Sequence, residues 1–218
     1  MKKDFAVIFD LDGTLLNTDS LIMETFQYVF KKYFPNYKLR QEELLSFLGP
    51  SLWETFSRYV SKDKVDELVE CYKEYNHQHH ENFVTIYPYV QETLEILKQR
   101  NYPLVIVTSK TTEAAYIGLD LFNISNYFDE VIGIDKVKNA KPDPEGILKA
   151  LSMTNCVKGV MIGDNISDIK CGKNADIYTI GVKWSPKGYQ EMEGFGVDLL
   201  IDDMSEIVKF IEEVSEEC

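Results

Sequence analysis

The chain has 218 residues, of which 44% are hydrophobic and 27% charged, a composition typical of a folded globular protein rather than a disordered or fibrous one. The 36 acidic residues exceed the 23 basic ones and give a net charge of −13, which argues against general binding to nucleic acid. Ten of the acidic residues but only one basic residue lie in 189–218, so most of this charge belongs to the C-terminal segment.

No segment of the sequence is typical of secretion or of membrane insertion. The apolar runs fall short of the roughly 18–20 residues that a membrane helix needs, and the first residues do not resemble a signal peptide. The four cysteines are widely spaced and form no CxxC pair: Cys71, Cys156, Cys171 and Cys218. We therefore expect a cytoplasmic protein with free thiols and no membrane partner. No residue pattern indicates the oligomeric state.

The first predicted element is a buried strand at 5–9, a continuous apolar run that is too short for a helix. Asp10 and Asp12 follow it, and Gly13 permits a sharp turn. Two carboxylates two residues apart can point the same way only while the backbone stays extended. Asp10 and Asp12 could instead form an acidic turn without a catalytic role, but the polar residues that follow the other predicted strands argue against this interpretation.

The segment after this strand breaks the pattern, because residues 18–84 have helical periodicity throughout and contain no convincing buried strand. Short breaks divide it, at 35–36, 49–50 and 61–62. It is far longer than the roughly 2–6 residues that usually connect a strand to a helix. We predict a helical bundle at 17–85, inserted into a main domain formed by 1–16 and 86–218.

The rest of the chain alternates strands with helices. Apolar runs predict four more strands, at 104–107, 131–134, 159–162 and 178–182. One intervening helix is expected to have Asp143 as its N-cap and Pro144 at its first position, and a final amphipathic helix extends from Met204 to Val214. This alternation predicts right-handed βαβ units and a three-layer, Rossmann-like α/β fold, with a parallel sheet covered by helices on both faces.

Polar residues follow the predicted strands and should meet at one edge of the sheet. The carboxyl ends of parallel strands form the crevice in which α/β proteins bind ligands. The residues that the sequence places there are Asp10, Asp12, Thr108, Ser109, Lys110, Lys141, Asp164 and Asp168. Asp164 and Asp168 are one helical turn apart, and they could equally cap the helix that follows.

These groups suit phosphoryl transfer through an aspartyl phosphate, with Asp10 as the nucleophile. An anionic carboxylate approaches an anionic phosphate only if the charge is offset, which Mg²⁺ would do. We expect Asp10, the backbone carbonyl of Asp12, and Asp164 to hold the metal, with Asp168 binding it directly or supporting its ligands.

The remaining groups would handle the proton and the phosphoryl oxygens. Asp12 would protonate the leaving oxygen and then take a proton from the attacking water. Thr108 and Lys141 would bind the phosphoryl oxygens, and Lys141 would also neutralise Asp10. Ser109 and Lys110 are candidate substrate contacts, although they could be ordinary polar loop residues.

Four motifs in order resemble those of the haloacid dehalogenase superfamily: FDLDGTL at 9–15, VTSK at 107–110, KPDP at 141–144 and GDNISD at 163–168. The resemblance covers essentially the whole chain. It implies a Mg²⁺-dependent phosphatase whose helical insert is a cap that closes over the site and selects a small anionic phosphate.

The insert itself resembles the phosphoglycolate phosphatase branch of that superfamily, in GPSLWETFSR at 49–58 and in the pattern FxxxYPxV at 83–90. FLGPSL and YNHQHHENF at 75–83 are similar to the bacterial inorganic pyrophosphatases of this branch. The resemblance implies hydrolysis of pyrophosphate, with Gly49 and Arg58 as candidate substrate contacts. Gly49 could instead be a simple helix break, and Arg58 could pair with a neighbouring acid.

Several alternatives stay open at this point. The substrate could be phosphoglycolate or another small phosphomonoester, and a sugar phosphomutase shares the motifs. A dehalogenase is disfavoured because Asp12 and Asp164 have less to do in a metal-free displacement of halide. A phosphoaspartate receiver module is disfavoured by Asp12 and by the helical insert. The histidine run at 77–80 could suggest a metal site, but a polar helix end is the favoured interpretation.

Overall fold

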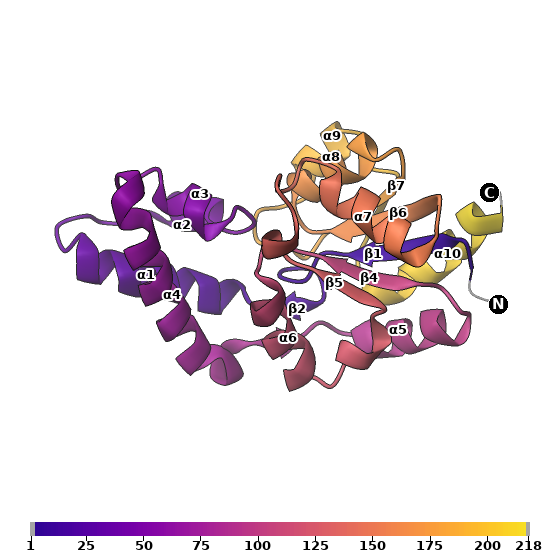
Figure 1. Ribbon diagram of the computed structural model, residues 1–218, viewed down its shortest axis with the longest axis horizontal. Helices are drawn as coiled ribbons and strands as arrows, with labels where there is room; N and C mark the ends of the chain where they lie inside the picture. Colours follow the sequence, from indigo (N-terminus) through magenta and orange to yellow (C-terminus); the bar gives the residue numbers. More distant parts are fainter. Residues whose placement is uncertain (1–2, 217–218) are drawn as a thin grey trace. The chain divides into compact units, whose positions relative to one another are not determined.

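The computed structural model describes residues 3–216, so the expectation of a free thiol at Cys218 lies outside the described residues. The chain forms two compact units (Figure 1). One, the core unit, comprises the residues up to Leu16 and those from Ile86 onward; the other, the helical unit, is Asn17–Thr85. The chain passes between the units within two short strands that pair with each other, β2 (Leu16–Asn17) and β3 (Thr85–Ile86).

A six-stranded sheet runs through the core unit, with every neighbouring pair parallel and in the order β5-β4-β1-β6-β7-β8. The strands are β1 (Phe5–Phe9), β4 (Leu104–Val107), β5 (Glu130–Ile132), β6 (Lys158–Gly163), β7 (Tyr178–Val182) and β8 (Leu199–Ile201). All residues of β1 and β4 are buried, as expected of strands covered on both faces. The predicted parallel sheet is confirmed, and β8 is a strand that the sequence pattern did not reveal.

Helices cover both faces of this sheet (Figure 1). They are α5 (Val90–Gln99), α6 (Thr112–Leu121), α7 (Glu145–Thr154), α8 (Ile166–Asn174), α9 (Gln190–Gly194) and α10 (Ile207–Glu216), with 3-10 turns at Ser125–Tyr127, Ile134–Lys136 and Met204–Glu206. Ala6 and Ile8 pack in one core cluster with residues of α7 and α8. Phe5 points to the other face and contacts Tyr178, whose ring meets Phe210 of α10 edge-on. The three-layer α/β architecture is therefore confirmed.

Helix α7 begins one residue later than the sequence predicts. Pro144 is the N-cap and Glu145 the first helical residue, whereas the sequence pattern placed these roles at Asp143 and Pro144. The Asp143 carboxylate still accepts a hydrogen bond from the backbone N–H of Glu145, at 3.0 Å. The side chain therefore stabilises the helix start from just outside it.

The helical unit contains α1 (Asp19–Tyr33), α2 (Gln41–Ser46), α3 (Leu52–Phe56) and α4 (Lys62–Phe83). Its core is strongly aromatic: the ring centroid of Phe26 lies 4.6 Å from that of Phe47, 5.3 Å from Phe56 and 4.8 Å from Tyr72. Among the described residues, no helix combines the length and the apolar character needed to cross a bilayer. This unit is an independent helical core with its own buried cluster.

Candidate active site

The sheet brings two acidic residues to its carboxyl edge. β1 lies between β4 and β6, and Phe9 is in register with Ile162, so the chain after β1 and the chain after β6 continue side by side. The backbone N–H of Asp10 extends this pairing by donating to the carbonyl of Ile162, at 2.8 Å. Asp10 and Asp164 therefore occupy neighbouring strand ends, as the sequence analysis predicted.

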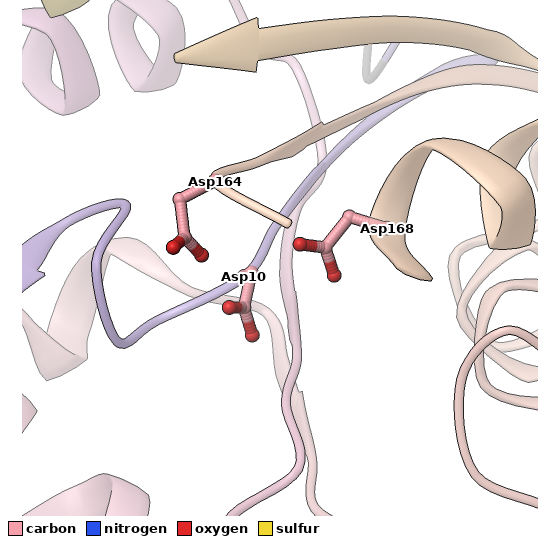
Figure 2. A group of neighbouring side chains, drawn as sticks. All are labelled: Asp10, Asp164 and Asp168. Atoms are coloured by element: carbon pink, nitrogen blue, oxygen red, sulfur yellow. The ribbon is translucent and has the colours of Figure 1, made fainter. Parts of the chain in front are cut away.

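Asp168, in the first turn of α8, completes a cluster of three carboxylates (Figure 2). Each of the three residues has a carboxylate oxygen within 4.8 Å of an oxygen of the others. All three side chains are buried: Asp10 and Asp164 are 6% exposed and Asp168 is fully covered. Burying ionised carboxylates together is costly unless positive charge compensates them.

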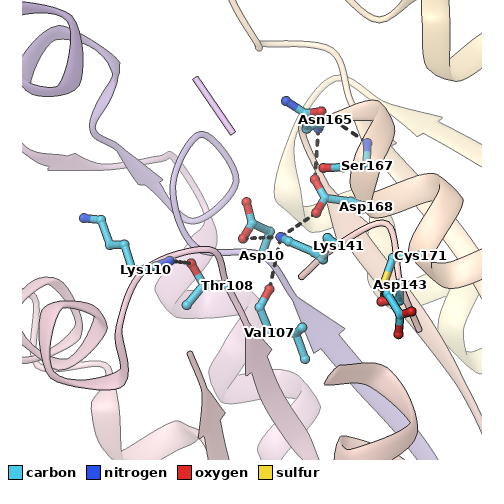
Figure 3. A network of polar contacts seen from close by, with 10 residues as sticks. All are labelled: Asp10, Val107, Thr108, Lys110, Lys141, Asp143, Asn165, Ser167, Asp168 and Cys171. Atoms are coloured by element: carbon cyan, nitrogen blue, oxygen red, sulfur yellow. Dashed lines mark hydrogen bonds and ion pairs between the residues drawn. The ribbon is translucent and has the colours of Figure 1, made fainter. Parts of the chain in front are cut away.

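Lys141 supplies part of that compensation. Its Nζ lies 2.8 Å from Oδ1 of Asp10 and 2.6 Å from Oδ1 of Asp168, and it donates to the carbonyl of Val107 at 3.2 Å (Figure 3). Burial alone would lower the pKa of Lys141, but the two carboxylates outweigh it and raise the pKa well above its ordinary value. Lys141 therefore stays protonated between Asp10 and Asp168.

One ammonium does not fully offset the cluster. The pKa of Asp10 is raised to about 7: burial and the nearby charges of Asp168 and Asp12 raise it, and together they outweigh Lys141, which lowers it. The arrangement thus has a surplus of negative charge and several carboxylate oxygens within a few ångströms of one another. This donor set fits Mg²⁺, which prefers oxygen ligands and binds through one or two carboxylates.

Asp168 also caps the helix on which it lies. Its Oδ2 accepts a hydrogen bond from the backbone N–H of Asn165 at 3.0 Å, while the Asn165 side chain accepts one from the backbone N–H of Ser167. Capping and a role in the site are therefore compatible, because Oδ2 caps the helix while Oδ1 pairs with Lys141.

The cap of α8 requires a glycine at 163. A Cβ atom at this position would lie 2.4 Å from the Asp168 side chain. We predict that Gly163→Ala displaces the Asp168 carboxylate and lowers phosphate release by about 10- to 100-fold, because a displacement of about 1 Å in a catalytic site has costs of this order. Gly194→Ala is the matched control, since a Cβ there meets nothing within 4 Å. Equal activity of the two variants would contradict this explanation.

Asp12 and Lys110 form an ion pair, with Oδ1 and Nζ 3.0 Å apart and with side chains that are 20% and 18% exposed, respectively. Gly13 follows Asp12 with a φ of +74°, a conformation that glycine adopts without strain. A Cβ on Gly13 would lie 2.6 Å from Oδ2 of Asp164, so the turn packs directly against that carboxylate. The turn thus carries Asp12 to the site edge while covering Asp164.

Thr108 and Ser109 line a hollow that also includes Lys141, at the carboxyl end of β4. Thr108 is buried, and its hydroxyl accepts a hydrogen bond from the backbone N–H of Lys110 at 3.2 Å. The Glu145 carboxylate stabilises the loop that carries Lys141 by accepting hydrogen bonds from the backbone N–H groups of Lys138 and Asn139. The hydrogen bond from Lys141 to the carbonyl of Val107 joins the third motif to the second (Figure 3).

Two predicted substrate contacts belong to the helical unit. Gly49 has a φ of +101° in the connection between α2 and α3. Arg58 follows α3 and forms an ion pair with Glu54 at 2.7 Å, with its side chain 44% exposed. The roles of Gly49 and Arg58 stay predictions.

The histidine run lies near the end of α4, where the sequence analysis favoured a polar helix end. His79 stacks on Tyr75, with ring centroids 4.0 Å apart, and its Nδ1 is 2.8 Å from the Tyr75 carbonyl oxygen. Among the described residues, the group of metal-ligating side chains that lies close enough together to hold an ion is the aspartate cluster.

Two residues outside the predicted set also contact the site, Trp184 and Ser185. Trp184 donates its indole N–H to the carbonyl of Gly13 at 2.9 Å, and the Ser185 hydroxyl donates to Oδ2 of Asp164 at 3.1 Å. Both follow β7, whose carboxyl end lies at the same sheet edge. A polar residue just after a buried strand is the feature that identified Thr108 and Asp164, and the same feature would have identified Ser185.

Comparisons with known proteins agree with this geometry. A family model described as haloacid dehalogenase-like hydrolase matches residues 7–182. The chain is 42% identical over 208 residues to pyrophosphatase PpaX of Listeria monocytogenes serotype 4b (strain CLIP80459), covering 94% of this chain and 95% of the relative.

Solved structures give the same assignment. A haloacid dehalogenase-like family hydrolase from Streptococcus pneumoniae aligns with a TM-score of 0.82 and 26% identity, over 94% of this chain and 97% of that one. A β-phosphoglucomutase from Clostridium difficile aligns with a TM-score of 0.84 over 100% of this chain and 98% of that one, but its 22% identity shows the fold alone. With the four motifs gathered at one sheet edge and the family model matching most of its length, this chain belongs to the haloacid dehalogenase-like hydrolases.

Proposed function

We propose that this protein hydrolyses inorganic pyrophosphate to phosphate through an aspartyl phosphate on Asp10. The observation that carries the proposal is the buried Asp10 carboxylate, held by Lys141 beside Asp164 and Asp168. The substrate is inferred from the 42% identity to a protein named a pyrophosphatase.

The metal proposed for the site is Mg²⁺, held by the side chains of Asp10 and Asp164 and by the backbone carbonyl of Asp12. When bound, it neutralises negative charge on the carboxylates and on the phosphoryl oxygens, so that the two can approach. Asp168 supports the site through its contacts to Lys141 and to the start of α8. Lys141 orients the Asp10 nucleophile, and Lys141 and Thr108 orient the phosphate.

Asp10 attacks phosphorus, and the bond from phosphorus to the bridging oxygen breaks, leaving phosphate and an acyl phosphate on Asp10. Lys141 keeps the Asp10 oxygen oriented, and Lys141 and Thr108 bind the phosphoryl oxygens. Asp12 protonates the leaving oxygen and then takes the proton of the water that hydrolyses the acyl phosphate. Ser109 and Lys110, which is paired with Asp12, would contact the second phosphate of the substrate.

The helical unit is proposed to act as a cap, since a connection of this length and internal core is far more than a strand-to-helix loop requires. Closure of such a unit would exclude water and select the substrate. The aromatic core of the unit would let it move as one body. Gly49 and Arg58 would then be its contacts to the substrate.

A substrate panel tests the proposal directly. With Mg²⁺ present, kcat/KM for pyrophosphate should exceed that for phosphoglycolate by about tenfold or more, because phosphate is a better leaving group than the alkoxide of glycolate and an enzyme discriminates between substrates through kcat/KM. Sugar phosphates should be poorer still. A higher kcat/KM for phosphoglycolate would replace pyrophosphate with the second candidate, a small phosphomonoester.

A second prediction concerns Arg58. Arg58→Ala should raise the KM for pyrophosphate by about tenfold with little change in kcat, because the arginine would bind the substrate without taking part in bond breaking. Arg40→Ala is the matched control: Arg40 is also an exposed arginine of the helical unit paired with a glutamate, Glu43. If both variants keep the wild-type KM, Arg58 is not a substrate contact.

A further inference from the structure

The loop that follows β7, residues 183–188, lies against the site and belongs to none of the four motifs. We propose that two of its residues position the reacting groups: Ser185 orients the metal-binding carboxylate of Asp164, and Trp184 fixes the turn that carries Asp12. This inference rests on the proposed function, because it assigns Asp164 to the metal and Asp12 to proton transfer.

Ser185 acts on the carboxylate directly. Its hydroxyl donates to Oδ2 of Asp164 at 3.1 Å, and both residues are buried, with exposed fractions of 6%. Because little water reaches this bond, the hydroxyl restricts rotation of the carboxylate about its side-chain torsion. Groups that hydrogen-bond to a metal ligand in this way preset its orientation and raise metal affinity.

Trp184 acts on the neighbouring turn. Its indole N–H donates to the carbonyl of Gly13 at 2.9 Å, and its ring packs against that of Tyr87 with centroids 5.3 Å apart. The backbone N–H of Tyr87 in turn donates to the carbonyl of Leu15 at 3.0 Å. The indole is therefore held between the turn after β1 and a residue bonded to that same segment.

Both hydrogen bonds lie where the turn after β1 closely approaches the Asp164 carboxylate. The Cβ position of Gly13 lies 2.6 Å from Oδ2 of Asp164, the same oxygen that accepts the Ser185 hydroxyl. Trp184 and Ser185 are adjacent in sequence, so this short loop holds both sides of the contact between the Asp12 turn and the Asp164 carboxylate. A shift of the loop would move the proton donor and the metal ligand together.

The Ser185 test measures Mg²⁺ binding by titration calorimetry without substrate, at a temperature well below the Tm of each variant. Ser185→Ala should weaken Mg²⁺ binding by about 10- to 100-fold, the usual effect of removing such a supporting group. Ser185→Thr, which keeps the hydroxyl, should bind within about threefold of the wild type. Ser205→Ala is the control, because it removes another hydroxyl–aspartate bond, to Asp203, away from the site.

The Trp184 test measures kcat and Mg²⁺ affinity. Trp184→Phe keeps a ring against Tyr87 but loses the N–H donor, so kcat should fall about tenfold. Because the same turn also carries the Asp12 carbonyl proposed as a metal ligand, Mg²⁺ binding should weaken as well, but by less than in Ser185→Ala. Trp53→Phe is its control, since the Trp53 indole donates to Asp66 in the helical unit.

The outcomes distinguish a failure of the positioning roles from a failure of the proposed function. Wild-type Mg²⁺ affinity in Ser185→Ala, or wild-type kcat in Trp184→Phe, overturns the corresponding positioning role and leaves the proposed function intact. A wild-type protein that binds no Mg²⁺ would overturn the proposed function and the role of Ser185 with it. Weaker Mg²⁺ binding in Ser185→Ala, restored in Ser185→Thr, supports the inference.

Discussion

Asp10→Asn should abolish phosphate release from pyrophosphate, with a loss in kcat of at least about 10⁴-fold, because no other group can replace a covalent nucleophile. The amide nitrogen and oxygen of asparagine do not form an acyl phosphate. The measurement is Mg²⁺-dependent phosphate release, with Tm recorded to confirm folding. Retained turnover in a folded Asp10→Asn protein would refute the nucleophile assignment.

Asp202→Asn is the matched control for this variant. Asp202 directly follows β8, just as Asp10 directly follows β1, but its carboxylate is 76% exposed and pairs with Lys183 at the surface. Its activity should stay within about twofold of the wild type, as is usual for exposed positions away from a site. An equal loss in both variants would point to a general effect on the sheet edge.

Lys141→Met should damage both stability and catalysis. Lys141 is the cation paired with both Asp10 and Asp168, and its side chain is 7% exposed. Removing one partner of a buried ion pair typically costs about 3–5 kcal/mol of unfolding free energy, since the remaining charge is left uncompensated. In addition, kcat should fall by about 10³-fold, because a preorganised cation at the phosphoryl oxygens is lost. Urea denaturation and phosphate release measure the two effects.

A double variant separates these effects. In Lys141→Met, the carboxylates of Asp10 and Asp168 are left buried without their lysine partner. Adding Asp168→Asn removes one of these charges and should recover part of the lost unfolding free energy without recovering activity. Lys183→Met is the control, because its partner Asp202 is exposed and such surface pairs contribute only about 0–1 kcal/mol. Wild-type stability of Lys141→Met would contradict the role given to this ion pair.

The strand ends were the part of the site that could be predicted from sequence. Apolar runs identify buried strands, and parallel strands must present their carboxyl ends at one edge, so the proximity of Asp10 and Asp164 follows from pattern and topology. The helical character of the inserted segment was also predictable, because its apolar residues recur with helical spacing and α1, α2, α3 and α4 lie within it.

Other contacts depend on loop geometry that no periodicity encodes. Spacing alone does not place Lys141 beside Asp168 or Lys110 beside Asp12, although the charge of Asp10 led to the expectation that Lys141 would neutralise it. The strand β8 was missed because it spans three residues between acidic neighbours, too short a run for any pattern. Trp184 and Ser185 lie outside the four motifs, so their position after β7 was the one indication of a role in the site.

The acidity of the chain also has a clearer meaning in the structure. The surplus of buried carboxylate at the site, offset in part by Lys141, is what makes a divalent cation fit and what allows an anionic substrate to be proposed. Two described acidic residues of the C-terminal segment form ion pairs outside the aspartate cluster: Glu212 with Arg100, and Asp202 with Lys183. Net charge alone therefore says little about the substrate.

The most direct test of the central claim is to trap the acyl phosphate. The protein is mixed with Mg²⁺ and pyrophosphate, quenched during turnover, and reduced with borohydride, which converts an aspartyl phosphate to homoserine. Peptide mass spectrometry should find homoserine at position 10 only when Mg²⁺ and pyrophosphate are both present. Turnover with homoserine at another position, or with none at any position, would contradict an aspartyl phosphate on Asp10.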